Sequence, residues 1–256
     1  LSLVRGGRRL WKKSFPLAVV PARPNQVVIG PRGETFVDGK PFFPIGTYGA
    51  PPEEYGKLKK AGYNFVMASA NDLDKLEQAG LMGVVTVERN DVREFANKYK
   101  DHHALLAWMM FDEPGYNRAD ILEIHNLYNT LYKLDPKHLS YLVITDPKVY
   151  PTFGRCCDVL TVDTYPVQGG IITDAGKNIA QAYEVSEGDQ PVWHCGQFFA
   201  WPGQRMPTIR EHRFMTYIAL INGAKGLLWY TYKGYGQYLP EKNPELWEAH
   251  KKMLKE

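Results

Sequence analysis

Short apolar runs recur along the chain at the length of buried strands. They occupy residues 42–47, 63–69, 81–87, 105–111, 140–145, 158–164, 191–197 and 226–231. Apolar runs of this length, bounded by turn residues, are typical of strands buried on both faces, as in a parallel sheet. The pattern therefore predicts a series of eight buried strands.

Amphipathic segments with helix start and stop signals lie between these runs. Helices are expected at residues 52–61, 72–79, 92–100, 119–134, 209–222 and 244–254. The clearest has a capping box formed by Thr208 and Glu211, and Gly223 supplies a left-handed stop. The segment between Asp146 and Arg155 is short and interrupted by Pro151, so it predicts the weakest helix of the set.

Alternating strands and helices favour parallel strands with helices outside, and eight repeats close into a barrel. The predicted fold class is α/β, a (β/α)8 TIM barrel over residues 42–256, which we expect to be the catalytic domain. A hairpin is expected at 26–41, and residues 1–25 form a leader or linker. An open doubly wound sheet is the alternative, but no Gly-x-Gly-x-x-Gly turn follows the first strand.

Charge and composition narrow the classes of function. The chain has 256 residues, 44% of them hydrophobic, with a formal net charge of +3. Six Lys and Arg lie in the first 25 residues without any acid, and 25 Lys and Arg remain against 28 Asp and Glu in the rest. This mildly acidic body gives no reason to expect a nucleic-acid partner, and no apolar run is long enough to predict a membrane span.

Location and thiol chemistry are less constrained. A secreted or periplasmic location is favoured over a cytoplasmic one, with a signal upstream of this chain and further domains in a longer parent protein. The three cysteines, of which Cys156 and Cys157 are adjacent, predict free thiols rather than a disulfide framework. No cysteine or histidine pair has metal-ligand spacing, so we expect no metal and no cofactor.

The carboxyl ends of the predicted strands carry acids, amides and aromatics. Barrel enzymes place their chemistry on these ends. Sugars offer hydroxyls for polar contacts and C–H faces for ring stacking, whereas phosphates require Arg, Lys or Gly-rich turns. A carbohydrate substrate is therefore expected, with substrate-binding residues Tyr48, Tyr165, Gln197, Trp229, Tyr230 and Tyr232; Trp201 is a further aromatic candidate.

The fourth run is the most informative, because residues 105–111 are apolar and then Asp112 and Glu113 appear together. Carboxylates at the end of a buried strand are costly unless they are paired or their pKa is shifted. A charge on Asp112 would help to keep Glu113 protonated, as a general acid for a glycosidic oxygen requires. A solvated loop is the alternative interpretation.

Several segments in order resemble those of clan A glycoside hydrolases. The resemblance rests on FPIGTY at 43–48, LKKAGYNFV at 58–66, Trp108 to Pro114, PVWHCGQF at 191–198 and GAKGLLWY at 223–230, and it covers residues 41–256. It implies a β-linked glycan as substrate, with Glu113 as the acid/base at the end of the fourth strand. Two positions depart from the family: Asp112 replaces an Asn, and Gln197 replaces the seventh-strand nucleophile Glu.

An amide cannot act as a carboxylate nucleophile, so the departures leave three alternatives. The Asp112–Glu113 pair is similar to that of substrate-assisted N-acetylhexosaminidases, in which the Asp orients the acetamido group that attacks; Tyr165 or Gln197 would hold that group. An inverting enzyme would use Asp163 or Asp146 as the base. A non-catalytic carbohydrate-binding barrel is the third alternative, kept open by Gln197.

Overall fold

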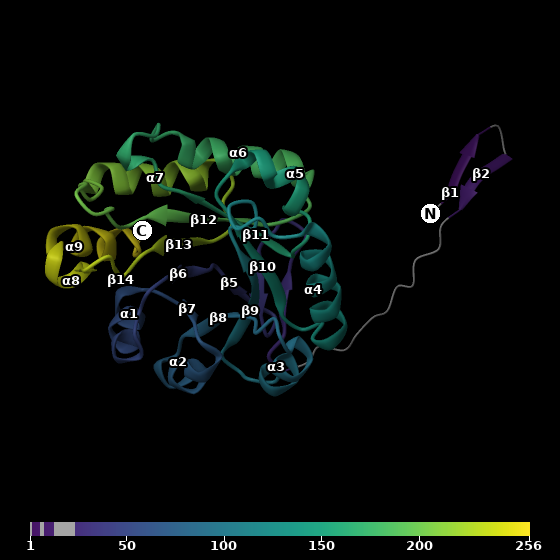
Figure 1. Ribbon diagram of the computed structural model, residues 1–256, viewed down its shortest axis with the longest axis horizontal. Coiled ribbons are helices and arrows are strands. Elements are labelled where there is room, and N and C mark those ends of the chain that lie inside the picture. The colour runs from purple at the N-terminus through teal and green to yellow at the C-terminus, as the bar shows by residue number, and fades with distance from the viewer. Residues whose placement is uncertain (1, 6–7, 13–23) are drawn as a thin grey trace.

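The computed structural model describes residues 2–5, 8–12 and 24–256, and its centre is a closed eight-stranded barrel (Figure 1). All neighbouring barrel strands are parallel. In chain order they are β6 (Ile45–Thr47), β7 (Phe65–Ala68), β8 (Met82–Thr86), β9 (Leu105–Asp112), β10 (Leu139–Ile144), β11 (Val159–Thr164), β12 (Val192–Gln197) and β13 (Leu227–Tyr230). Each of the eight predicted runs overlaps one of these strands, with ends that differ by at most three residues, so the predicted TIM barrel is confirmed.

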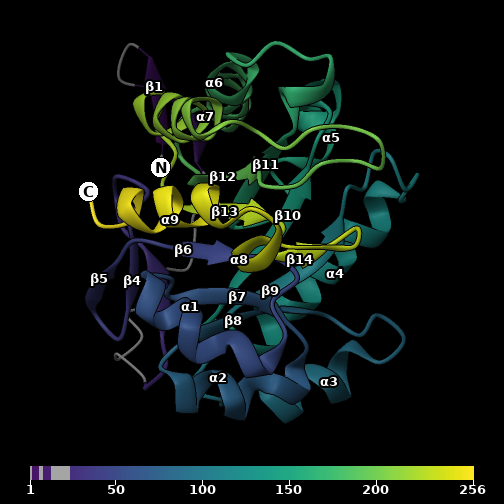
Figure 2. The same cartoon turned by 90° about the vertical axis from the view of Figure 1, so that its left-hand side faces the viewer.

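Helices surround the barrel, as Figures 1 and 2 show. They are α1 (Tyr55–Ala61), α2 (Leu73–Ala79), α3 (Val92–Tyr99), α4 (Ile121–Leu134), α5 (Tyr150–Phe153), α6 (Asp174–Ser186), α7 (Ile209–Ile221), α8 (Leu239–Lys242) and α9 (Pro244–Met253). Four short 3-10 turns are η1 (Pro52–Glu54), η2 (Ala70–Asp72), η3 (Pro147–Val149) and η4 (Pro166–Gln168). The Thr208–Glu211 capping box is present, and the fifth helix is the short one predicted.

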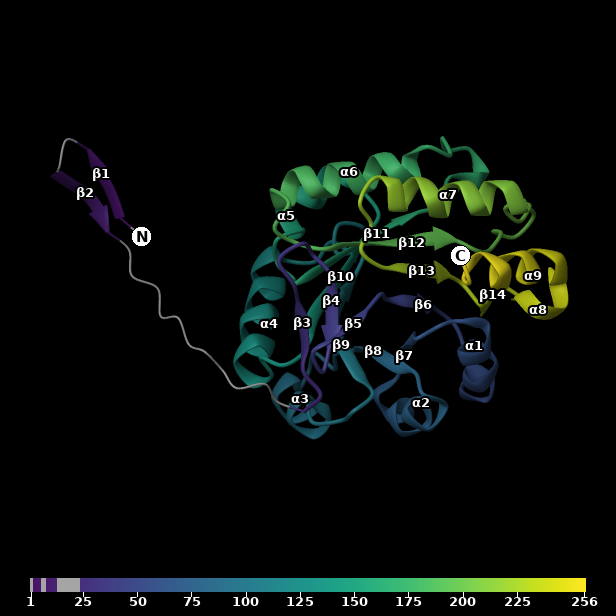
Figure 3. The same cartoon turned by 180° about the vertical axis from the view of Figure 1, so that it is seen from behind.

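The small N-terminal sheet has one strand more than the predicted hairpin. Strands β3 (Val27–Ile29), β4 (Thr35–Val37) and β5 (Lys40–Phe42) pair antiparallel in that order. Figure 3 shows this sheet in front of the barrel strands. The Val27 amide donates to the carbonyl of Lys137, 2.8 Å away and just before β10, so the sheet lies at the N-terminal end of the barrel.

Most of the predicted leader, residues 1–25, lies outside the described residues or is described only as backbone. Strands β1 (Ser2–Arg5) and β2 (Arg8–Lys12) form a separate antiparallel pair. Asn25, by contrast, is 2% exposed and donates to Nε2 of His138 at 3.0 Å. The chain is therefore packed against the barrel from Asn25 onward. No helix within the described residues is long and apolar enough to cross a membrane.

Two apolar clusters hold the fold together. One lies between strands and helices, and the other fills the barrel interior. In the interior the ring of Trp193 packs against Phe65 and Tyr141, with centroid distances of 5.6 and 5.7 Å. Gly46 on β6 makes room for this packing, because a Cβ there would lie 2.3 Å from the Phe65 ring. Large aromatics thus close the barrel below its C-terminal end, where the polar strand ends remain.

Candidate active site

A small cavity at the C-terminal end of the barrel contains the three predicted catalytic acids. Its volume is about 170 Å³, and its lining residues are Tyr48, Asp112, Glu113, Val143, Asp163, Tyr165, Trp201, Tyr230 and Tyr235. The acids come from β9 and β11, which are not neighbours in the barrel because β10 separates them. Barrel closure therefore brings Asp163 to the acids that end β9.

Two irregularities in β9 direct its acids into this cavity. The register skips one residue between the pairs Gly83–Leu105 and Val84–Ala107, and another between Tyr141–Met109 and Leu142–Phe111. A bulge of this kind re-aims the side chains that follow it. Glu113 then adopts a left-handed backbone with φ of 46°, which ends the strand at the acid.

Glu113 and Asp163 form the centre of the site. The Thr145 hydroxyl donates to Oε1 of Glu113, and Asp163 lines the same cavity. Asp163 is 3% exposed. Burial, followed by the charge of Glu113, raises the pKa of Asp163 well above its ordinary value. Burial and a neighbouring like charge both favour the protonated form of a carboxyl, so Asp163 holds a proton more readily than an ordinary aspartate.

Asp112 has a different environment, because part of its surface is exposed to solvent. The protein atoms around the rest of the side chain, followed by the charge of Glu113, raise the pKa of Asp112 to about 6. At neutral pH this carboxyl is mostly ionised, whereas the surroundings of Asp163 favour its protonated form. The site therefore combines an ionised carboxylate with a buried acid whose protonated form is favoured.

Aromatic side chains wall the cavity. Three of them, Tyr48, Tyr165 and Tyr230, were predicted to bind substrate and do line it. Tyr230 is 5.3 Å from Tyr48 and 6.0 Å from Tyr165 between ring centroids. Trp201 also lines it and contacts Tyr235, with centroids 5.1 Å apart. Sequence reasoning missed Tyr235, which sits at the turn between β14 (Lys233–Gly234) and β15 (Gln237–Tyr238).

Three other predicted substrate-binding residues do not line the cavity. Trp229 is 1% exposed and packs between the barrel and α9, 4.5 Å from the ring of His250. Tyr232 is fully buried, and its hydroxyl donates to Glu54 at 2.8 Å. Trp229 does not line the cavity because side chains alternate between the two faces of a strand. When Tyr230 faces the interior, Trp229 faces the helices.

Gln197 is also fully buried, with its amide engaged by the backbone. Its Oε1 accepts from the Val167 amide at 2.9 Å, and its Nε2 donates to the Phe199 carbonyl at 3.2 Å. Asp146, the second base considered for inversion, is exposed and accepts from the Lys148 amide at the start of η3. Neither side chain lines the cavity that holds Glu113.

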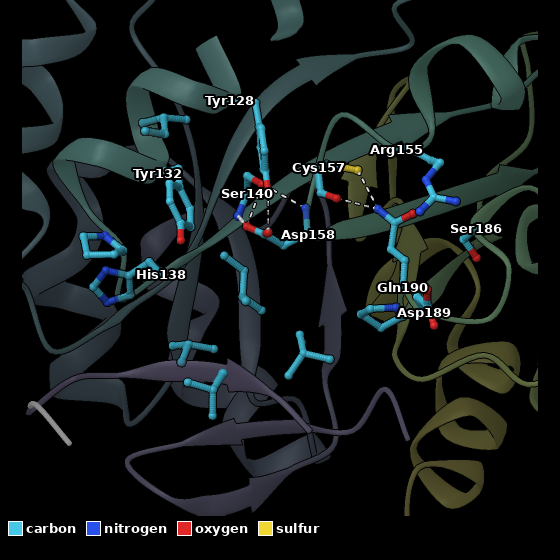
Figure 4. Close-up of a pocket in the computed structure, with 17 residues that line it drawn as sticks. Tyr128, Tyr132, His138, Ser140, Arg155, Cys157, Asp158, Ser186, Asp189 and Gln190 are labelled. Atoms are coloured by element: carbon cyan, nitrogen blue, oxygen red, sulfur yellow. Dashed lines mark hydrogen bonds between the residues drawn. The ribbon is translucent and has the colours of Figure 1, made fainter. Parts of the chain in front are cut away.

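A larger cavity of about 410 Å³ lies at the opposite end of the barrel, beside β3 and α4 (Figure 4). Its polar groups mainly satisfy one another. Asp158 accepts from the hydroxyls of Tyr128 and Ser140 at 3.2 and 2.7 Å, and Nε2 of Gln190 donates to the Cys157 carbonyl at 2.6 Å. This cavity holds no carboxyl pair that could exchange a proton with a ligand, so the chemistry is assigned to the smaller one.

Among the described residues, one group of acids and histidines converges closely enough for a metal: Asp74, Glu77 and His102 on the surface. Nδ1 of His102 accepts from the Ala104 amide at 3.1 Å, and Nε2 lies 3.0 Å from Asp74. The neutral ring therefore carries its hydrogen on Nε2, directed at Asp74, and offers no lone pair there. Surface hydrogen bonding explains this group without a metal.

Known proteins share the fold of this chain at low sequence identity. No protein-family model matches the sequence, and no curated protein does. Solved structures do match, among them a β-galactosidase from the psychrophilic Marinomonas ef1, with TM-score 0.67 and 10% identity over 83% of this chain. Two others are β-glucuronidases, from Parabacteroides merdae (TM-score 0.60, 13% identity, 80% of this chain) and an uncultured Clostridium sp. (0.64, 14%, 90%).

These structural neighbours are glycosidases. At such identities the likeness shows the barrel fold that this chain has in common with them. The chain spans 33% of the Parabacteroides merdae protein, 53% of the Clostridium protein and 59% of the Marinomonas protein. Functional assignment therefore depends on the cavity residues of this chain.

Proposed function

We propose that this protein is a glycoside hydrolase that cleaves an O-glycosidic bond of a β-linked glycan, with Glu113 as the general acid. The observation that carries the proposal is the convergence of Asp112, Glu113 and Asp163 in one aromatic cavity at the C-terminal end of the barrel, where the charge of Glu113 helps to raise the pKa of Asp163. Perturbed carboxyl pairs in a cleft are typical of acid–base sites. The glycosidase neighbours agree with this class of reaction.

A protonated carboxyl in this cavity supplies the proton that the reaction uses. Glu113 donates it to the glycosidic oxygen as the bond from that oxygen to the anomeric carbon breaks, and an alcohol leaves. Glu113 then carries a negative charge, which is offset by the positive charge that develops on the sugar ring. When water attacks the anomeric carbon, a carboxylate of the site accepts its proton, and proton exchange through solvent restores the acid form of Glu113, so protons and charge balance over the cycle.

We do not assign Asp163 the role of the base of an inverting enzyme. A base must be ionised, whereas burial and the charge of Glu113 raise the pKa of Asp163 well above its ordinary value. Asp112, ionised and open to solvent, either orients a substrate acetamido group or accepts the proton of the attacking water.

Aryl β-glycosides of glucose, galactose, glucuronic acid, glucosamine and N-acetylglucosamine test the proposal. Glu113→Gln retains the size of the side chain but removes the transferable proton. Turnover of substrates with poor leaving groups should fall by roughly 10²–10⁴. Glu184→Gln, an exposed position on α6, is the matched control. Wild-type protein that hydrolyses none of the panel yet binds sugars would support a non-catalytic carbohydrate-binding barrel instead.

A further inference from the structure

The cavity of Glu113 is negative and lacks a cationic side chain. Three of its lining residues are acids, five are aromatic, and among these described lining residues there is no Lys, Arg or His. A ligand carboxylate would face three carboxyl groups there, without a partner of opposite charge. A ligand cation would be attracted by them.

Two buried oxygens of residues that line this cavity have no hydrogen-bond partner within the described chain. They are Oδ1 of Asp163 and the hydroxyl of Tyr48. Buried polar atoms without a partner are rare in folded proteins, because each carries a desolvation penalty. An ammonium group offers three donors and no acceptor, so it can satisfy both oxygens as acceptors. Both oxygens can therefore accept hydrogen bonds from a donor-rich cation.

The walls favour the same kind of ligand. Tyr48, Tyr165, Tyr230, Tyr235 and Trp201 all lie along one small cavity, and aromatic faces attract cations. The volume of about 170 Å³ suits one sugar unit rather than several. Within the described residues, the three acids do not form a group with ligand atoms convergent enough to hold a metal ion. An organic ammonium thus fits this arrangement better than a metal.

We propose that the cavity selects a glycoside whose sugar carries a protonated amino group, such as a glucosaminide, over neutral sugars and uronic acids. This inference rests on the proposed function, in that the same cavity binds the sugar whose bond is broken. It also selects between the two roles of Asp112. A protonated amine has no acetamido oxygen to attack the anomeric carbon, so water attacks and Asp112 accepts its proton.

A binding measurement tests the inference without using activity. Methyl β-thioglycosides of glucosamine, glucose and glucuronic acid resist hydrolysis, and their dissociation constants can be compared by calorimetry with the wild-type protein. Hydrogen bonds to charged groups strengthen binding by the equivalent of roughly 10- to 100-fold, so the glucosamine compound should bind tighter than the glucose compound by that factor. The glucuronic acid compound should bind weakest. Equal binding of all three overturns the inference.

Kinetics separates this inference from the proposed function. Aryl glycosides of the same sugars with one leaving group should show the same order in kcat/KM. Hydrolysis without preference for the amino sugar overturns the inference and leaves the glycosidase proposal standing. Preferential binding of the glucosamine compound without hydrolysis of any glycoside supports the inference and overturns the glycosidase proposal.

A pair of substitutions tests the aromatic contribution. Trp201→Phe keeps an aromatic face at the rim, whereas Trp201→Leu removes it. Cation–π contacts have energies that correspond to roughly 2- to 30-fold in binding, so Trp201→Leu should lose that much affinity for the glucosamine compound, with little change for glucose. Tyr116→Leu, at a residue 83% exposed outside this cavity, is the control. An equal loss of affinity for both sugars in Trp201→Leu would contradict a cation–π contact between Trp201 and the amino group.

Discussion

Gln197 accepts a hydrogen bond from the amide of Val167 at 2.9 Å and so ties the end of β12 to the loop after β11. Its Nε2 donates to the Phe199 carbonyl at 3.2 Å. A glutamate would replace that donor with an oxygen facing an oxygen. Gln197→Glu should therefore lower the free energy of unfolding by about 1–3 kcal/mol at pH 7. Urea unfolding measures this.

The pH dependence gives this prediction a second readout. A protonated glutamic acid can donate to the Phe199 carbonyl, so the loss should be smaller at pH 4 than at pH 7. Gln78→Glu, exposed on α2, should change stability little at either pH. If Gln197→Glu instead gave a faster glycosidase, with a covalent glycosyl intermediate trapped on the introduced carboxylate, the structure would be contradicted, because such a side chain must face the cavity.

Asp163 is expected to reduce stability in the wild-type protein. Its pKa is raised in the folded state, so above pH 4 the unfolded chain releases a proton that the folded chain keeps, and stability falls as pH rises. Asp163→Asn removes this penalty and can donate to Glu113. The melting temperature should rise by at least roughly 2–4 °C at pH 7, the shift of about 1 kcal/mol in a chain of this size.

The same substitution should have little effect near pH 3, where Asp163 is mostly protonated in both the folded and the unfolded state. Calorimetric scans at the two pH values measure the difference. Asp189→Asn, an exposed acid outside the site, provides the control. A lower melting temperature for Asp163→Asn at pH 7 would show that the carboxyl is stabilised by partners rather than strained.

The fold could be predicted because buried parallel strands leave continuous apolar runs and helix ends leave caps. The strand β5 was missed, since Pro41 within Lys40–Phe42 argues against a strand; an edge strand tolerates it, and β5 pairs with β4 at the edge of its sheet. Helix α6 was not singled out either. Its sequence DAGKNIAQAYEVS carries mixed polar and apolar residues and no side-chain cap.

The acids of the site could be predicted because each follows an apolar strand. Their partners could not. The bulges of β9 depend on pairing with β8 and β10, and the contact of Gln197 with Val167 joins residues 30 positions apart. Tyr235 belongs to a hairpin beyond the last barrel strand, and no periodicity in the sequence predicts where that hairpin lies relative to the barrel. Strand ends thus identify the type of chemistry, while long-range packing decides which side chains share the cavity.

Asn25 should contribute to stability although it borders the N-terminal segment. Its Nδ2 lies 3.0 Å from Nε2 of His138, whose Nδ1 is 2.7 Å from Asp135, and Trp108 donates to the same carboxylate at 2.8 Å. Asn25→Ala leaves His138 without this donor. The free energy of unfolding should fall by about 1–3 kcal/mol, measured by urea titration.

Asn126→Ala, at an exposed position of α4, is the control and should stay within roughly 0.5 kcal/mol of wild type. Equal stability of the two variants would show that Asn25 is not held against the barrel.

Buried neutral histidines should make the protein sensitive to acid. The Tyr63 hydroxyl lies 2.6 Å from Nε2 of His250, and Nδ1 of His250 lies 2.8 Å from Nε2 of His212. Burial lowers the pKa of His212 to about 3 and that of His194 to about 4, and it lowers the pKa of His250 well below the ordinary value.

The sign of the effect follows from proton binding. Below about pH 6.5 the unfolded chain binds protons that the folded chain does not, so stability is fully present above this pH and falls as the pH drops toward 4. Each such histidine contributes a slope of up to about 1.4 kcal/mol per pH unit.

His212→Gln removes one of them. Its free energy of unfolding should therefore change less between pH 7.5 and pH 5 than that of the wild type, even if the variant is less stable at both. His125→Gln, at an exposed position of α4, should keep the wild-type slope. Urea unfolding at the two pH values gives the change of stability with pH. The same change for His212→Gln and wild type would mean that His212 is already protonated in the folded protein, which would contradict a neutral hydrogen-bonded series from Tyr63 through His250 to His212.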